Sequence, residues 1–389
     1  MTKFKKTILF IHRWLGFISG LVVFIVSITG CIFCFQDEIQ DAMRPYRHVE
    51  VQHKPYLNPT ELRRIAFKGH PDAVSNYLYY YGPDRPACVL ATLDKKGPFM
   101  YVYINPYTGE LLHTEDLSKN FFVIIEYIHL YILLPPAIGK WVVGVSVIIF
   151  VALMITGIIL WWPKRKSDRK RSLTIKWNSR WRRVNYDLHN VLGFYATSIA
   201  LILALTGLAI AFEPVDKAIY KVANLGADNH EESIIPKSDS LHTTNPVKLA
   251  PIDNAFLQAR AQSPASQMFL ISNASGASGV IGISAYPKSL YFGMRDEFSF
   301  DQYSGKLLKK LPYEKQSAGM KLNGLNYDIH VGQALGLFGK IVAFLGSLIC
   351  ASLPVTGFIV WLGKRNKKGS KTRKVAHRRT HEKIARTTA

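Results

Sequence analysis

The sequence predicts a mainly α membrane protein with four transmembrane helices and two external α+β lobes, produced by an internal duplication. Three observations carry this prediction: four apolar stretches, basic clusters confined to alternate connections, and segments that match each other in the two halves of the chain. The chain has 389 residues, of which 48% are hydrophobic. It is too apolar for one soluble domain and too polar to lie entirely in a membrane.

Four apolar stretches are long enough to cross a hydrocarbon core, which needs about 20 apolar residues. They cover about residues 9–35, 138–162, 190–213 and 336–362. Four crossings place both ends of the chain on the same side of the membrane. Because the first stretch is too long for the apolar part of a signal peptide and lacks a small-residue cleavage site, we expect it to remain as an anchor.

The positive charge is concentrated in three segments. The net charge is +22, and the Lys and Arg residues cluster at the N-terminus, in residues 163–183 and in residues 364–383. Four crossings bring these three segments to the same side, and basic flanks mark the cytoplasmic side of a membrane. We therefore expect cytoplasmic termini and contact with anionic lipid rather than nucleic acid. The segments at about 36–125 and 214–328 then lie outside the cytoplasm.

The two halves of the chain share a set of matched positions, which indicates a repeat. The matches are His12 with His189, Thr29-Gly30 with Thr206-Gly207, His129 with His330, Gly139-Lys140 with Gly339-Lys340, and Thr156-Gly157 with Thr356-Gly357. Each half therefore contains two membrane segments with one external segment between them.

The external segments match as well. "YVYINPYTGELLHTE" (101–115) and "FSFDQYSGKLLKKLP" (298–312) each predict a strand, a turn containing Gly and a second strand. "NPTELRRIAFKGHP" and "APIDNAFLQARAQSP", which precede them, each predict a helix. We expect each lobe to pack one helix on a small antiparallel sheet.

These observations divide the chain into eight parts. They are transmembrane helix 1 (1–36), external lobe 1 (37–120), an interfacial helix with transmembrane helix 2 (121–162), a basic cytoplasmic loop (163–186), transmembrane helix 3 (187–213), external lobe 2 (214–325), an interfacial helix with transmembrane helix 4 (326–362) and a basic cytoplasmic tail (363–389).

Four of the twelve histidines occupy matched positions at the mouth of a membrane segment: His12, His129, His189 and His330. The predicted topology places His12 and His189 near the cytoplasmic face. It places His129 and His330 at the external face. A continuous helix from His129 to Trp161 would be about 48 Å long, whereas the hydrocarbon core is about 30 Å thick. We therefore expect a helix break at Pro135-Pro136, with His129 in the external interface.

Paired imidazoles on facing helices suit axial ligation of a planar cofactor, and ionisable groups within a membrane are costly and usually functional. We expect two b-type haems, held by the pairs His12/His189 and His129/His330, so that electrons can cross the membrane. For a single histidine, the alternatives are interaction with headgroups, a hydrogen bond between helices, or a proton relay.

Three cations near these histidines are candidates for contact with haem propionates by charge-assisted hydrogen bonds: Arg13, Lys140 and Lys340. Their alternative role is that of interfacial cations that extend to the membrane surface. The four Thr-Gly pairs and Gly16-x-x-x-Gly20 allow either close helix approach or space for a cofactor.

Other chemical motifs are few. Cys31 and Cys34 form C-x-x-C without the following His of a haem attachment motif, which favours packing over redox chemistry. The sequence has no catalytic triad, no His-Glu-x-x-His and no P-loop. The aromatic stretch "YLYYYGPD" (77–84) is explained by strand packing or by a substrate surface.

The "IHRWLGF…TG" and "LHNVLGF…TG" segments, the "TGIILWWPKRK" and "TGFIVWLGKRNK" exits and the "YTGELL" and "YSGKLL" hairpins resemble the PepSY-associated transmembrane family, which groups with iron-regulated inner-membrane proteins. The resemblance implies PepSY-like lobes in a bacterial periplasm. Its siderophore-reductase-like branch implies a di-haem inner-membrane enzyme that reduces a ferric siderophore, with haem ligation by the four matched histidines.

The expected activity is therefore electron transfer to a periplasmic ferric siderophore or other ferric chelate, which releases iron. Because the cytoplasmic loops are too short for a flavin or nicotinamide domain, we expect the electron donor to be another protein or a quinol. Two alternatives remain open: an inner-membrane transporter or permease for siderophore or metal, whose histidines relay protons or bind metal, and a non-enzymatic periplasmic sensor or scaffold.

Overall fold

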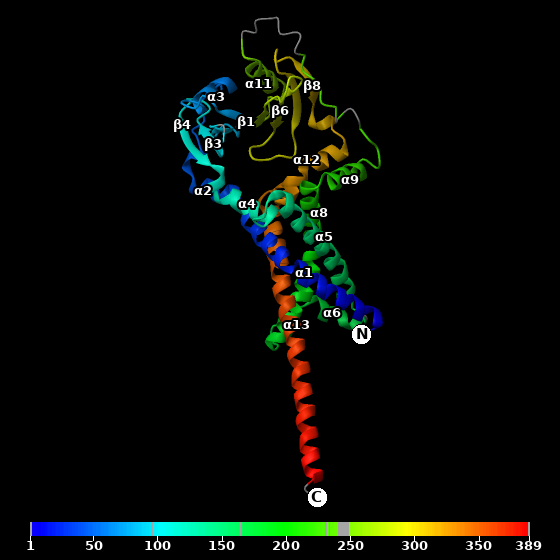
Figure 1. Cartoon of the computed structure of the whole chain (residues 1–389). Helices are drawn as coiled ribbons and strands as arrows, with labels where there is room; N and C mark the ends of the chain where they lie inside the picture. The colour runs from blue at the N-terminus through cyan, green and yellow to red at the C-terminus, as the bar shows by residue number, and fades with distance from the viewer. Residues whose placement is uncertain are drawn as a thin grey trace. The chain divides into compact units, whose positions relative to one another are not determined.

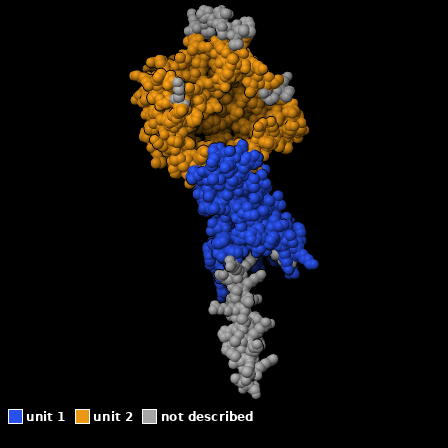
Figure 2. Space-filling model, viewed as in Figure 1, with its two compact units in different colours: residues 1–31, 128–205, 342–389 blue, residues 32–127, 206–341 orange. Residues whose placement is uncertain are grey.

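The computed structural model describes residues 2–94, 96–163, 165–229, 232, 234–239 and 249–387, with side chains as far as residue 363. The chain forms two compact units, which Figure 2 distinguishes by colour. Unit 1 contains residues 1–31, 128–205 and 342–389, and unit 2 contains residues 32–127 and 206–341.

Within the described residues, four helices are long and apolar enough to cross a membrane. They are Lys3–Cys34 (α1), Pro136–Trp161 (α5), Trp181–Ala211 and Gln333–Gly363. The third combines α7 (Trp181–Asp187), a π-helical segment (Leu188–Leu192) and α8 (Gly193–Ala211), and the fourth includes the start of α13 (Gly336–Thr387). The four predicted membrane helices are confirmed, and their exposed apolar side chains suit contact with lipid.

Mostly small residues lie where the helices of unit 1 contact one another. Met154 of α5, Ala200 and Ala204 of α8, and Cys350 of α13 form one buried cluster. A Cβ at Gly20 of α1 would lie 3.4 Å from Cβ of Pro354 of α13. Close approach of helices, one of the two roles expected for the Gly16-x-x-x-Gly20 pattern, is therefore what Gly20 provides.

The expected helix break after His129 is confirmed. The helix α4 (Phe121–Tyr131) ends before Ile132 and Leu133, which have positive φ values of 47° and 62°, and α5 begins at Pro136. In the second half α12 (Ala318–His330) ends before Gly332, which has a φ of 81°. Glycine serves there because a left-handed residue between two helices carries no steric penalty when it has no side chain.

Unit 2 is built around one antiparallel sheet of eight strands in the order β4-β3-β2-β1-β5-β6-β7-β8 (Figure 1). The strands are β1 (Val74–Tyr80), β2 (Ala87–Thr92), β3 (Phe99–Ile104), β4 (Leu111–Asp116), β5 (Met268–Ser272), β6 (Val280–Tyr286), β7 (Asp296–Asp301) and β8 (Leu307–Leu311). The expectation of two lobes with separate small sheets needs a correction, because β1 pairs with β5 from Tyr77↔Ser272 to Tyr80↔Phe269. This pairing satisfies the backbone groups that two separate sheets would leave exposed along these edges.

The helices α3 (Pro59–Ala66) and α11 (Pro251–Gln262) confirm the two helices expected ahead of the hairpins. Both contribute to a single core that includes Leu62, Tyr80, Phe256 and Phe300. The rings of Tyr80 and Phe256 stack with centroids 4.3 Å apart. Asp253 of α11 accepts a hydrogen bond from the backbone N–H of Thr60 at the start of α3, at 2.9 Å. The two lobes therefore share one hydrophobic core.

The predicted hairpins are β3-β4 and β7-β8, and their turns require glycine. Gly109 and Gly305 have φ values of 77° and 66°. A Cβ at Gly109 would lie 2.8 Å from Cδ1 of Ile65 in α3, and a Cβ at Gly305 would lie 2.5 Å from the carbonyl oxygen of Pro251 in α11. Each turn therefore needs glycine both for its backbone conformation and for its contact with the helix.

The remaining elements are short. They are α2 (Gln36–Met43), α6 (Arg169–Leu173), α9 (Glu213–Ala223) and the 3₁₀ turns Pro45–Arg47, Leu117–Lys119, Lys166–Asp168, Tyr313–Lys315 and Gln333–Leu335.

Candidate functional site

Each of the four matched histidines contacts the Thr-Gly pair of the other membrane segment in its own half. Nδ1 of His12 lies 2.8 Å from Oγ1 of Thr156, and Nδ1 of His129 lies 3.1 Å from Oγ1 of Thr29. The second half repeats the exchange, with His189 3.0 Å from Thr356 and His330 2.9 Å from Thr206. Because paired helices run antiparallel, a histidine at the start of one helix is level with a Thr-Gly pair at the end of the other.

Three of the threonine hydroxyls lie within hydrogen-bond distance of both a histidine ring and a carbonyl oxygen of their own helix. Thr29, Thr156 and Thr356 donate to the carbonyl oxygens of Ile25, Ala152 and Ser352 in their own helices, at 2.8, 2.9 and 2.9 Å. A hydroxyl has one proton, so each of these oxygens accepts a hydrogen bond from Nδ1–H of its histidine. In a neutral imidazole this arrangement leaves the lone pair on Nε2, which is the atom that a metal would bind.

The glycine of each Thr-Gly pair makes room for the imidazole. A Cβ at Gly207 or Gly357 would lie 3.0 Å from Cε1 of His330 or His189. At Gly30 and Gly157 the corresponding distances to His129 and His12 are 3.4 and 3.6 Å. The glycines of the Thr-Gly pairs therefore lie against the imidazoles, a contact that neither expected role of these pairs included.

Two of the histidines lie close together within unit 1. The ring centroids of His12 and His189 are 6.4 Å apart, and their planes are inclined at 87°. Two imidazoles on opposite sides of one metal have centroids about 6 Å apart, because each metal–nitrogen bond is about 2 Å long and each ring adds about 1 Å. The separation of His12 and His189 therefore matches that of two axial ligands. His129 belongs to unit 1 and His330 to unit 2, so the pairing of these two remains a prediction.

A pentapeptide repeat marks the second half and escaped the sequence comparison. "NYDLH" ends at His189 and "NYDIH" ends at His330. Asn185 donates to the carbonyl oxygen of Thr356 at 3.0 Å, and Asn326 donates to that of Thr206 at 3.2 Å. Each asparagine therefore binds the Thr-Gly pair that also contacts a histidine, and this histidine lies one helical turn after the asparagine. The first half has Ile8 and Ile125 in place of the asparagines.

The two aspartates of this pentapeptide have different surroundings. Asp187 is buried and pairs with Arg183 at 2.8 Å. Asp328 is fully buried and accepts hydrogen bonds from the backbone N–H groups of Phe292 and Gly293, at 3.2 and 2.7 Å. Burial raises the pKa of Asp328 to about 6, although these hydrogen bonds oppose the shift. Asp328 therefore attaches the loop before β7 to the helix that ends at His330.

The backbone around His189 is π-helical, unlike the regular α-helix around His12. Such segments often occur at functional sites because the extra residue in the turn reorients the side chains. No sequence pattern predicted it, since the two segments match at His, Leu, Gly and Phe without an insertion.

The three candidate cations differ in their surroundings. Nε of Arg13 is buried and has no hydrogen-bond partner among the described residues. Lys140 is exposed, whereas Lys340 is buried and its ammonium group lies 2.8 and 3.0 Å from the two carboxylate oxygens of Glu38. The matched lysines therefore have different environments, and Lys340 already has an anionic partner within the protein.

The four cysteines are buried and form no disulfide bonds. Among the residues that the structure describes, no group of three or more His, Cys, Asp or Glu side chains could hold a metal ion. Haem iron bound through two histidines needs only two protein ligands, because the macrocycle supplies the others.

Four apolar helices, an antiparallel sheet and histidines held at the helix ends define a membrane protein with a β-rich region and a candidate cofactor site. Residues 9–364 match the profile of the PepSY-associated TM region, and the chain belongs to this family. Membership of this family, predicted from the sequence, is confirmed, and the siderophore-reductase-like branch stays a prediction. A search of curated proteins gave no match.

Proposed function

We propose that this protein is an inner-membrane electron-transfer protein that binds two b-type haems and reduces a ferric siderophore or another ferric chelate outside the cytoplasm. The observation that carries the proposal is the His12/His189 pair, whose centroid separation of 6.4 Å suits two axial ligands. Nδ1 of both rings lies within hydrogen-bond distance of a threonine hydroxyl, which is how imidazoles that bind a metal through the other nitrogen are held.

The residues around this pair fit a haem. Arg13, next to His12, has a buried Nε–H without a partner among the described residues, and a propionate is the kind of acceptor it lacks. The glycines at positions 157 and 357 leave the imidazole edges uncovered by a side chain. Haem supplies one-electron redox chemistry when it is bound.

The protein's own groups would hold and orient this cofactor. Thr156 and Thr356 fix the ring orientation of His12 and His189 by accepting from Nδ1–H. Asn185 adds a second contact behind His189 through the carbonyl oxygen of Thr356. His129 and His330 have the same threonine contacts, so we assign the second haem to them. In this assignment Lys340 retains Glu38 as its partner, and Arg13 is the cation that we assign to a propionate.

The test is spectroscopic. Full-length protein purified from haem-replete cells should show a Soret band and about two haems per chain in the pyridine haemochrome assay. His129→Ala and His330→Ala should each lower the content to about one haem. His53→Ala, which changes an exposed histidine outside the matched set, should retain two. Colourless protein would overturn the proposal and would favour the transporter or the sensor alternative.

A further inference from the structure

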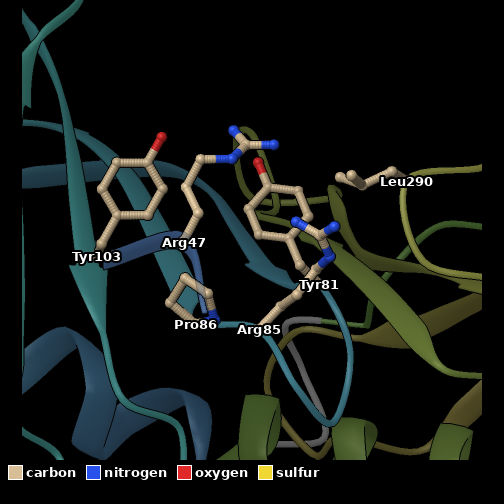
Figure 3. Close-up of a pocket in the computed structure, with 6 residues that line it drawn as sticks. All are labelled: Arg47, Tyr81, Arg85, Pro86, Tyr103 and Leu290. Atoms are coloured by element: carbon tan, nitrogen blue, oxygen red, sulfur yellow. The ribbon is translucent and has the colours of Figure 1, made fainter. Parts of the chain in front are cut away.

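A polar recess lies in unit 2. It is lined by Arg47, Tyr81, Arg85, Pro86, Tyr103 and Leu290. Figure 3 shows the guanidinium group of Arg47 beside the hydroxyl of Tyr81, with Arg85 next to the same ring and Leu290 on the opposite side. The tyrosine stretch that the sequence left open between packing and a substrate surface therefore contributes Tyr81 to a recess.

Two aspartates hold the arginines of this recess in place. Asp41 accepts hydrogen bonds from Nε of Arg47 at 2.6 Å and from both terminal nitrogens of Arg85 at 3.0 and 2.6 Å. Asp37 accepts from Nη2 of Arg47 at 3.0 Å. The arginine side chains are only 11% and 14% exposed. Their guanidinium groups are therefore fixed before any ligand arrives.

The lining offers more donors than the aspartates use. A guanidinium group has five N–H donors and no acceptor, and the contacts with the aspartates engage two donors of each arginine within the described residues. Burial raises the pKa of Tyr81 and of Tyr103 well above the usual value, so both hydroxyls keep their protons. Donors that the aspartates leave over, in a recess that opens to solvent, favour a ligand that is rich in acceptor oxygens.

We propose that this recess binds an oxyanionic group, such as a carboxylate, hydroxamate or catecholate, of the ferric chelate that accepts electrons. The inference rests on the proposed function. Because two arginines face two aspartates, the set has no net charge, and recognition would come from directed hydrogen bonds rather than long-range attraction.

The loop that bears Leu290 connects the recess to the helix of His330 within unit 2. Gln333 donates from its side chain to the carbonyl oxygen of Leu290, and the hydroxyl of Tyr291 donates to the carbonyl oxygen of Gln333. Gly293 donates to Asp328 at 2.7 Å. Asp328 and Gln333 flank His330 in the sequence. Their contacts therefore attach the loop that lines the recess to the segment that carries this candidate ligand. A chelate bound there would be held on the part of the protein from which we expect electrons to leave.

The test uses gallium(III) chelates, which resemble ferric chelates in shape and charge but accept no electron under these conditions. Calorimetric titration of the full-length protein with gallium citrate, a gallium tris-hydroxamate and a gallium tris-catecholate would identify which oxygen chemistry is bound. We expect Arg85→Gln to weaken binding of the preferred chelate about 10- to 100-fold, and Tyr81→Phe about 3- to 10-fold. Arg64→Gln, which changes an exposed arginine paired with Glu61, should bind as the unchanged protein does.

Tyr81→Phe keeps the aromatic ring, so it still tests the recess if Arg85→Gln does not fold. Binding of no gallium chelate by the unchanged protein would overturn the inference, as would unchanged affinity in both recess variants. Haem content measured on the same samples separates this result from the proposed function. Colourless protein that binds the chelate through Tyr81 would support the recess and refute the electron-transfer role. Protein with two haems that binds no chelate would support the electron-transfer role and refute the recess.

Discussion

One added methyl group beside each of two histidines would test whether the Thr-Gly pairs position the imidazoles. A Cβ at Gly357 would lie 3.0 Å from Cε1 of His189, whereas a Cβ at Gly157 would lie 3.6 Å from Cε1 of His12. Carbon atoms in ordinary contact are about 3.5–4.0 Å apart. Gly157→Ala therefore fits its site, and Gly357→Ala must displace the ring of His189 by about 0.5 Å.

The expected free-energy changes differ accordingly. Alanine stabilises a helix relative to glycine by about 1 kcal/mol, and overpacking a filled site costs about 1–3 kcal/mol. Gly157→Ala should therefore leave the free energy of unfolding unchanged or raise it by up to about 1 kcal/mol. Gly357→Ala should lower it by up to about 2 kcal/mol, because the steric cost exceeds the gain in helix propensity.

The assay compares haem content and thermal unfolding of the two purified variants. If His189 is an axial ligand, its displacement in Gly357→Ala should weaken haem binding about 10- to 100-fold, as changes next to metal ligands do. Gly157→Ala should keep its haem. Equal loss of haem or of stability in both variants would refute the view that these glycines are fitted to the imidazoles.

Three further changes test other contacts. Thr356→Val removes the acceptor for Nδ1 of its histidine and should weaken haem binding about 10- to 100-fold. The matched control Thr197→Val, whose hydroxyl donates to a carbonyl of its own helix, should keep normal haem content, and a similar loss there would count against the tautomer assignment. Burial alone would raise the pKa of Asp41, but hydrogen bonds from two arginines outweigh it and the pKa lies below its usual value. Its stabilising contribution should therefore be complete above the unfolded-state pKa of about 4 and should disappear as the pH falls through the folded-state value. Asp41→Asn should reduce this loss in acid unfolding, and an unchanged pH profile would contradict it. Glu38→Gln removes the partner of the buried ammonium group of Lys340 and should lower the free energy of unfolding by about 1–3 kcal/mol, since Glu38 is half exposed. Unchanged stability in denaturant titration would indicate another partner for Lys340.

Much of the membrane part could be predicted from sequence. Apolar length located the four helices, and the matched spacing identified His12 and its three counterparts, because these depend only on the local sequence. The contact of His12 with Thr156 could not be predicted, because it depends on the rotation of two helices about their axes. The sequence does contain a sign of Asn185, because "NYDLH" and "NYDIH" repeat each other. Finding this repeat requires a comparison of the third span with α12, which the alignment of the two halves does not make.

The differences between matched residues depend on tertiary contacts. Lys140 and Lys340 are equivalent in the repeat, yet only Lys340 is buried against Glu38, which lies about 300 residues away in the sequence. The pairing of β1 with β5 likewise joins residues about 200 positions apart. Local patterns predicted the β3-β4 and β7-β8 hairpins, but the choice of partner for an edge strand is a property of the assembled core.

The strand order β4-β3-β2-β1-β5-β6-β7-β8 consists of two four-stranded halves that meet where β1 pairs with β5. An antiparallel pair of matched edge strands is what two identical chains form about a twofold axis. A half-length chain of residues 1–162 would contain two membrane helices, one four-stranded lobe and an open β1 edge. We expect it to associate into a twofold dimer with the same eight-stranded sheet, and a monomer in analytical ultracentrifugation would argue against this. By joining the halves covalently, the full chain makes the assembly of its sheet independent of protein concentration.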